Sequence, residues 1–281
     1  MTVYTPEVGD RITKLLAEFR LASAAEQTTK RFLDAGCDQA LGILAEVLEV
    51  EWQARRERRV DRLRRASRLP PAKTFDTLDP ARVPRNVLIQ ARDLARGAFV
   101  ERGDNVLLFG RPGVGKSHLA CALGHALVGA GISVLFIPTY QLVQQLLAAR
   151  RDLSLPRALR ALDAYEVMIL DDLGYVQQSA DEAEVLFTLM AERYERRSLL
   201  ITSNLVFSEW DRIFKNPMTT AAAIDRLVHH ATILEIDRGS IRAEEAKKRK
   251  DPKPTTTTPP RSTPREPPVG PARIVVASRQ K

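Results

Sequence analysis

The chain has 281 residues, a length typical of one or two domains. Hydrophobic residues make up 44% of it and charged residues 28%, which supports a globular core and excludes a wholly disordered chain, a collagen and a coiled-coil rod. Two cysteines, Cys37 and Cys121, cannot form a disulfide framework or a zinc cluster, so we expect a reduced, cytoplasmic protein. No apolar run approaches the ~20 residues of a membrane span, and the N-terminus does not resemble a signal peptide, so no membrane partner is expected.

Residues 1–69 predict a small helical domain. Apolar side chains recur with a helical period over residues 12–19. A second helix is expected over Ala22–Ala35. Asp38 is expected to cap a long third helix that stops before Pro70.

The predicted third helix carries a dense basic segment toward its carboxyl end. Eight arginines lie between positions 55 and 68, against two acids, Glu57 and Asp61. Such a surface is a candidate site for the phosphates of double-stranded DNA. The alternative is a solvated helix face without a ligand. The eight candidates for DNA contact are Arg55, Arg56, Arg58, Arg59, Arg62, Arg64, Arg65 and Arg68.

Residues 85–246 predict a second, larger domain, joined to the first by a linker over residues 70–84. Helices alternate there with short apolar strands, which is typical of an α/β fold with a parallel sheet covered by helices on both faces. The strands are expected at Asn105–Phe109, Ser133–Pro138, Val167–Leu170 and Ser198–Thr202. The helices are expected at Asn86–Phe99, Lys116–Gly129, Tyr140–Arg150, Leu155–Asp163 and Asp181–Arg196.

The chain ends in a basic tail, residues 247–281. After Lys250 it is rich in proline and threonine and has little apolar surface to bury, so we expect it to be disordered. Its positive charge either assists nucleic-acid binding without sequence preference or only keeps the chain soluble.

A phosphate-binding loop is indicated by residues 110–117, which satisfy the pattern G-x-x-x-x-G-K-[ST] between a predicted strand and a predicted helix. Glycines in such a loop allow backbone N–H groups to turn toward an anion. The Lys116 ammonium would bind the β- and γ-phosphates of ATP, and the Ser117 hydroxyl would bind Mg²⁺. The expected nucleotide contacts are Gly110, Gly113, Val114, Gly115, Lys116, Ser117 and His118.

Polar residues that follow the next predicted strands complete the chemistry of an ATPase. Asp171 would orient Mg²⁺, directly or through its water shell, and Asp172 would position or deprotonate the attacking water. Two carboxylates at a buried strand end are costly without a cation, which favours a metal site. Asn204 could hydrogen-bond both the γ-phosphate and the water, or it could be a simple turn residue.

The ordered set of motifs resembles the AAA+ clade that contains the bacterial helicase loader DnaC and the transposition helper IstB. The shared motifs are the phosphate loop, Asp171-Asp-Leu-Gly174, Thr202-Ser-Asn204, Asp225-Arg226-Leu227 and Gly239-Ser-Ile-Arg242. The arginine-rich helix followed by Lys73-Thr-Phe-Asp76 is similar to IstB in particular. The resemblance covers about residues 12–242 and implies an insertion-sequence ATPase. Such a protein oligomerises on DNA, stimulates a partner transposase and directs target-site selection.

The resemblance also implies roles for single residues. Asn204 would sense the γ-phosphate, and Arg226 would act as an arginine finger in the site of a neighbouring subunit. Arg242 would contact the nucleotide bound to its own subunit. The alternative for Arg226 is a surface ion pair with Asp225 or with a neighbouring carboxylate.

The sequence departs from the family pattern in two places. Asp172 stands where many AAA+ ATPases have glutamate, and only Met218–Ile241 remains for the helical lid that many of them carry.

The segment Tyr140–Arg151 is a second candidate surface for DNA, because it resembles the inserted helical region of initiator-type AAA+ proteins. Its terminal residues, Arg150 and Arg151, could touch DNA phosphates in a central channel, or could merely be favoured at a helix carboxyl terminus.

Two other functions remain open. A replicative helicase loader of the DnaC type shares the ATPase core but would use residues 1–68 to grip a helicase, which the dense arginines disfavour. A nucleotide-binding scaffold would change shape on ATP without hydrolysing it, which the presence of Asp172 and Arg226 disfavours.

Overall fold

The N-terminal part of the chain forms three helices around a small apolar core. The computed structural model describes residues 5–174, 179–214 and 216–237. The helices are α1 (Pro6–Glu18), α2 (Ala22–Asp34) and α3 (Asp38–Ala66). Ile12, Leu16 and Leu41 are buried between them, as the helical period predicts. The predicted cap is wrong by one position, because Asp38 is the first residue of α3 and Cys37 precedes it without a side-chain hydrogen bond to the helix.

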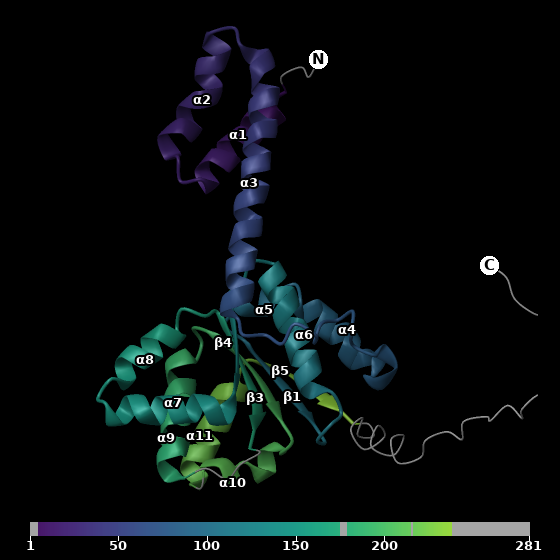
Figure 1. Cartoon of the computed structure of the whole chain (residues 1–281), viewed down its shortest axis with the longest axis vertical. Coiled ribbons are helices and arrows are strands. Elements are labelled where there is room, and N and C mark those ends of the chain that lie inside the picture. Colours follow the sequence, from purple (N-terminus) through teal and green to yellow (C-terminus); the bar gives the residue numbers. More distant parts are fainter. Residues whose placement is uncertain (1–4, 175–178, 215, 238–281) are drawn as a thin grey trace, which may run out of the picture.

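Helix α3 runs from the N-terminal helices to the sheet of the larger domain (Figure 1). Its 29 residues span about 43 Å at 1.5 Å per residue. Val60 and Leu63 on its last turns pack against an apolar core on one face of the sheet. Just beyond its end, the carbonyl oxygen of Ser67 accepts a hydrogen bond from the backbone N–H of Phe136 (2.8 Å). The arginine-rich part of α3 therefore adjoins the larger domain directly.

Residues 70–84, predicted as a linker, pack against the larger domain. Leu78 and Val83 are buried in the same core that receives α3. A short 3₁₀ turn, η1 (Pro80–Arg82), begins after Asp79, whose carboxylate accepts a hydrogen bond from the backbone N–H of Ala81 (3.0 Å). Leu78 and Val83 thus anchor this segment to the larger domain.

The helix predicted over Asn86–Phe99 is in fact two helices, α4 (Arg85–Leu94) and α5 (Ala98–Glu101). Gly97 between them has a φ of +86°, a left-handed conformation that ends a helix. A Cβ at this position would lie 2.6 Å from the Cδ1 atom of Ile132. Both backbone strain and lack of space therefore require glycine at this break.

Five parallel strands form one sheet in the order β2-β3-β4-β1-β5. They are β1 (Asn105–Gly110), β2 (Val134–Pro138), β3 (Val167–Leu173), β4 (Ser198–Ser203) and β5 (Ala231–Ile236). The first four agree with the predicted strands, whereas β5 was not predicted. Its residues fall within Met218–Ile241, the segment set aside for a reduced lid. They form an edge strand beside β1 instead.

Helices cover both faces of this sheet (Figure 1), which confirms the predicted fold class. They are α6 (Lys116–Gly129), α7 (Thr139–Arg151), α8 (Leu155–Leu162), α9 (Ala180–Arg193), α10 (Asp211–Phe214) and α11 (Pro217–Val228), with a 3₁₀ turn η2 (Phe207–Glu209). Alternate residues of β1 enter different cores. Val106 and Leu108 pack on the side of α6, whereas Leu107 and Phe109 pack on the side of α7 and α9. No helix within the described ranges is both long enough and apolar enough to cross a membrane.

Helix α9 ends in a buried arginine that binds the starts of two strands. Arg193 is 2% exposed. Its guanidinium donates hydrogen bonds of 2.9–3.3 Å to the carbonyl oxygens of Leu162, Tyr165, Glu166 and Ser198. Burial lowers the pKa of Arg193 to about 10, so the side chain stays protonated at neutral pH. One cation thus satisfies backbone groups at the amino ends of β3 and β4.

We expect Arg193→Met to lower the free energy of unfolding by about 3 kcal/mol, because it leaves buried carbonyl groups without donors. Urea denaturation followed by circular dichroism measures this loss. The matched control is Arg196→Met. Arg196 is 58% exposed and pairs with Asp163, so its loss should cost less than about 1 kcal/mol. Equal losses in the two variants would contradict the role given to Arg193.

Candidate functional site

The predicted phosphate loop joins β1 to α6 at the carboxyl edge of the sheet. Gly113 and Gly115 have φ angles of +80° and +102°, which glycine alone adopts without strain. Gly110 has no room for a side chain, because a Cβ would lie 2.5 Å from the carbonyl oxygen of Ile236. Val114 is buried beneath the loop. Since α6 begins directly behind Gly115, its N-terminal N–H groups attract an anion at this place.

Lys116 lies inside the loop with 5% of its surface exposed. Its ammonium donates hydrogen bonds to the carbonyl oxygens of Gly110 (2.7 Å) and Arg111 (3.1 Å). Ser117 follows it, half-buried, in the first turn of α6. A triphosphate in the loop would offer charged oxygens in place of these neutral carbonyls, and charge-assisted hydrogen bonds are the stronger.

A cavity of about 290 Å³ opens beside the phosphate loop. One wall consists of residues between Thr77 and Val83, which belong to the predicted linker, and the other includes Val114, Gly115 and His118. His118 connects the walls, because its Nε2 lies 3.2 Å from the Thr77 hydroxyl. Sequence reasoning missed the linker side of this cavity. The only available signal was a pair of apolar residues in a proline-rich segment.

The two predicted acids share one hydrogen-bonding partner. Asp171 is 8% exposed, and its Oδ1 accepts a hydrogen bond from the Thr202 hydroxyl (2.6 Å). The same hydroxyl oxygen accepts a hydrogen bond from the backbone N–H of Asp172 (2.9 Å). The Thr139 hydroxyl also donates to the carbonyl oxygen of Asp171 (2.9 Å). Sequence reasoning used Thr202 only as part of a motif. The sequence feature that could have indicated its role is a hydroxyl directly after the apolar run Leu199–Ile201.

Asp172 has an unusual backbone conformation at the edge of the sheet. Its φ is +57°, and the pairing of β3 with β4 is irregular between Leu170 and Leu173. The side chain of Asp172 is exposed, unlike that of Asp171. Asn204 follows β4 directly and is half-buried. Because β4 lies between β3 and β1, the acids, Asn204 and the phosphate loop all meet at one edge.

Arg226 lies at the opposite edge of the sheet. It is in the last turn of α11, whose end is bound to the start of β1 by a hydrogen bond from Asn105 Nδ2 to the carbonyl oxygen of Leu227 (3.2 Å). The phosphate loop follows the other end of β1, and this strand is about 16 Å long at 3.3 Å per residue. The guanidinium carbon lies 4.7 Å from the centre of the Phe187 ring. Its Nη1 atom is buried without a hydrogen-bond partner among the described residues, and Asp225 forms no ion pair with it there.

The position of one predicted nucleotide contact, Arg242, is not described. Arg242, like the tail over residues 247–281, lies outside the described residues. The described chain ends just after β5, whose last residue, Ile236, pairs with Gly110 of β1.

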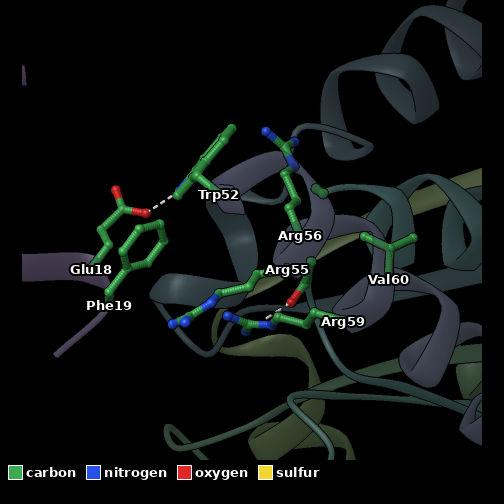
Figure 2. A pocket seen from close by; sticks show the side chains of 9 residues that line it. Glu18, Phe19, Trp52, Arg55, Arg56, Arg59 and Val60 are labelled. Carbon is green, nitrogen blue, oxygen red and sulfur yellow. Dashed lines mark hydrogen bonds between the residues drawn. The ribbon is translucent and has the colours of Figure 1, made fainter. Parts of the chain in front are cut away.

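Three of the eight arginines predicted to contact DNA line a cavity of about 430 Å³ (Figure 2), here called the arginine cavity. Arg55, Arg56 and Arg59 share it with Phe19, Trp52, Glu18, Val60 and the turn Ala130–Gly131 that follows α6. Arg59 donates a hydrogen bond to the carbonyl oxygen of Gly131 (3.1 Å). The cavity therefore lies where α1, α3 and the end of α6 meet.

Aromatic rings and two acids hold the side chains of the arginine cavity, since Arg55 also pairs with Glu51 (2.6 Å). The Arg55 guanidinium lies 4.4 Å from the centre of the Phe19 ring, and that of Arg56 lies 5.4 Å from the Trp52 ring. Figure 2 shows the Trp52 indole donating its hydrogen bond to Glu18. The cavity thus combines cationic and flat apolar surfaces.

The remaining arginines of α3 and its end differ in their pairing. Arg58 pairs with Glu51 (3.3 Å), and Arg64 pairs with Asp61 (3.2 Å). The exposed arginines without an ion pair to any residue in the described ranges are Arg62, Arg65 and Arg68. Arg62, Arg65 and Arg68 can therefore contact an external anion without first breaking an ion pair within the described ranges.

The second predicted DNA surface is partly paired. Arg150 at the end of α7 bonds the Glu184 carboxylate of α9 (2.9 Å) and lies 3.7 Å from Asp181. Arg151 beside it is exposed. Arg150 must therefore exchange an internal ion pair before it contacts a phosphate.

The sequence matches the family described as IstB-like ATP binding protein over residues 13–249. A putative insertion sequence ATP-binding protein of Sinorhizobium fredii is 46% identical over 208 residues, which cover 74% of this chain and 70% of that protein. The insertion sequence IS21 putative ATP-binding protein of Pseudomonas aeruginosa is 38% identical over 230 residues, 82% of this chain and 85% of that protein.

Two solved structures agree with the fold. AMPPCP-bound DnaA from Aquifex aeolicus has a TM-score of 0.52 at 13% identity and covers 68% of this chain and 59% of its own. DnaI has a TM-score of 0.51 at 20% identity and covers 60% of this chain and 95% of its own. These likenesses show an AAA+ fold, whereas the match over residues 13–249 shows the family. As the motifs predict, the chain belongs to the IstB-like ATP-binding proteins of insertion sequences.

Proposed function

We propose that the chain is a Mg²⁺-dependent ATPase that oligomerises on double-stranded DNA with active sites shared between subunits. We propose further that this assembly acts as a transposition helper, selecting or remodelling target DNA and stimulating a partner transposase. The observation that carries the proposal is the position of Arg226, at the sheet edge opposite to the phosphate loop of its own chain. Membership in an insertion-sequence family supports the link to transposition.

The carboxyl edge of the sheet has the residues that hydrolysis needs. Ser117 and Asp171 are the candidate ligands of Mg²⁺, which would supply positive charge to the phosphates. The fit is supported by the chemistry of Asp171, a buried carboxylate whose Oδ1 has only a neutral hydroxyl as its hydrogen-bond donor in the described structure. Asp172 is exposed at the same edge and would orient or deprotonate the attacking water. Asn204 would bind the γ-phosphate.

The remaining parts of ATP have places beside these residues. The cavity between residues 77–83 and the phosphate loop adjoins Gly115 and His118, so it would receive the nucleoside. Lys116 and the N–H groups at the start of α6 would bind the phosphates. Arg242 would contact the same nucleotide from beyond β5.

The position of Arg226 supports sharing of sites between subunits. Because the length of β1, about 16 Å, lies between the end of α11 and the phosphate loop, we infer that Arg226 does not reach the phosphates bound to its own chain. Its guanidinium lies over Phe187 of α9, and its Nη1 has no hydrogen-bond partner in the described structure, so an anion that drew the side chain outward would supply the missing acceptor. A γ-phosphate of a neighbouring subunit is such an anion, and it would make hydrolysis depend on assembly.

Two surfaces support DNA binding. The arginine cavity presents three guanidinium groups with aromatic rings, and Arg62, Arg65 and Arg68 continue the basic surface toward the sheet. Contacts to backbone phosphates give little sequence preference and strong salt dependence. Arg150 and Arg151 would add contacts in a central channel of the oligomer.

We expect Thr202→Val to lower the rate of ATP hydrolysis about tenfold, because the two acids lose the hydroxyl that positions them. Nucleotide affinity, measured with a fluorescent ATP analogue, should change little, since the phosphate loop is untouched. Thr202→Ser keeps the hydroxyl and is the matched control. An unchanged rate in the valine variant, or an equal loss in the serine variant, would contradict the positioning role.

We expect the hydrolysis rate per subunit to rise with protein concentration and with duplex DNA. Arg226→Ala should lower it about 10³-fold while nucleotide still binds. Arg212→Ala is the control, because Arg212 is an exposed arginine that pairs with Glu209 on the neighbouring turn. Mixing Arg226→Ala with Lys116→Ala should restore part of the activity, because the second variant supplies intact fingers to the first. A mixture without activity would refute sharing between subunits.

The double variant Arg56→Ala/Arg59→Ala should weaken binding to duplex DNA. It should also reduce the slope of log affinity against log salt by about 2, one for each lost phosphate contact. The control is Arg96→Ala/Arg102→Ala, which removes the same charge from exposed arginines of the larger domain. Fluorescence anisotropy over a salt series measures both. Equal behaviour of the two variants would place DNA contact elsewhere and favour the helicase-loader alternative.

A further inference from the structure

Three side chains of metal-binding type meet at the amino edge of the sheet. Glu195 follows α9, and His229 and His230 follow α11, and one ligand atom from each lies within 4.8 Å of the other two. The Glu195 Oε1 atom is 3.9 Å from His229 Nδ1 and 3.9 Å from His230 Nε2. In a tetrahedral site with bonds of about 2.1 Å, ligand atoms are about 3.4 Å apart. The Glu195–histidine distances are therefore about half an ångström longer than that spacing.

The backbone holds these residues in place. Glu195 has a φ of +55°, a left-handed conformation that is costly for glutamate and that is often found at functional sites. Gly103 leaves room for it, because a Cβ there would lie 3.0 Å from the carbonyl carbon of Glu195. The carbonyl oxygen of His230 accepts a hydrogen bond from the backbone N–H of Asn105 (2.7 Å). The carboxylate and the imidazoles are thus fixed by separate parts of the sheet edge.

Tyr194 lies beside the cluster and forms a hydrogen bond with one of its histidines, which metal binding would displace. Its hydroxyl lies 3.0 Å from His229 Nδ1. If His229 Nδ1 bound a metal ion, the phenol could turn its hydrogen bond to the adjacent Glu195. Carboxylate ligands of metal ions commonly have such an outer partner.

We propose that Glu195, His229 and His230 form a binding site for one divalent transition-metal ion of the Zn²⁺ class, with a fourth position open to water. Two imidazoles and one carboxylate suit Zn²⁺, whereas Mg²⁺ prefers oxygen ligands alone. The site lies at the edge of the sheet opposite to the phosphate loop, so it is distinct from the Mg²⁺ site at Asp171. It does not depend on ATP hydrolysis or on DNA binding.

The metal ion would tie the end of α9 to the end of α11. Arg226 is in the last turn of α11, His229 is the C-cap of that helix, and His230 follows it directly. Occupancy of the site would therefore restrain the helix end that carries Arg226.

The test is titration of the full-length, untagged chain with Zn²⁺ by calorimetry, and with Co²⁺ by visible absorption, in the presence of excess Mg²⁺. All variants are made in a Cys37→Ser background, because that exposed thiol is itself a metal ligand. We expect one ion per chain and a Co²⁺ spectrum typical of nitrogen and oxygen ligands. Glu195→Gln and His230→Ala should each weaken binding at least about tenfold. Zn²⁺ should also slow hydrogen–deuterium exchange at the end of α11.

The matched control is Glu192→Gln, which removes an exposed carboxylate of α9 that pairs with Arg196 outside the site. It should bind Zn²⁺ as the parent chain does. The proposal is overturned if Mg²⁺ displaces Zn²⁺, if His230→Ala binds as tightly as the parent, or if Glu192→Gln weakens binding as much as Glu195→Gln. Thermal denaturation without metal shows whether each variant keeps its fold.

Discussion

Parallel pairing of β1 with β4 on one side and β5 on the other sets the position of every group that faces the nucleotide. Because all strands run in one direction, the phosphate loop after β1, Asp171 on β3 and Asn204 after β4 share one edge of the sheet. The same constraint sends the end of α11, with Arg226, to the other edge. Under the proposed function, these two groups act together, so contact between two chains would be needed to bring them to one nucleotide.

Buried polar groups keep this arrangement in register. Thr202 binds Asp171 and the backbone of Asp172 across two neighbouring strands. At the other edge, the buried side chain of Asn105 accepts from the backbone of Leu199 and donates to that of Leu227. Such groups are costly when they lack a partner, so each of them disfavours any shift of one strand along the next. The end of the sheet that carries the phosphate loop and the end that carries Arg226 are thus fixed by hydrogen bonds of buried groups.

Helix α6 links the nucleotide site to the basic surface. Its first residue is Lys116, and the turn after its last residue accepts a hydrogen bond from Arg59 of the arginine cavity. The helix spans about 20 Å between these ends. Under the proposed function, a DNA phosphate that recruited Arg59 would act on the same helix whose other end would bind the phosphates of ATP.

Local pattern determined much of this protein. Helical periodicity, the glycine pattern of the phosphate loop and the acids after an apolar strand each depend on residues close together in the chain, so the helices α1–α3, the strands β1–β4 and the nucleotide motif could be derived from the sequence. The break at Gly97 was missed because the apolar pattern continues across it, and only the contact with Ile132 shows why glycine is required. Strand β5 was missed because an exposed edge strand lacks the continuous apolar run of its neighbours. Tertiary structure alone decided that residues 70–84 form a wall of the cavity beside the phosphate loop, that Thr202 binds both acids, and that Arg226 lies at the end of the sheet opposite to its own loop. Each of these facts depends on which distant strands pair and in which register, and no local pattern encodes that choice.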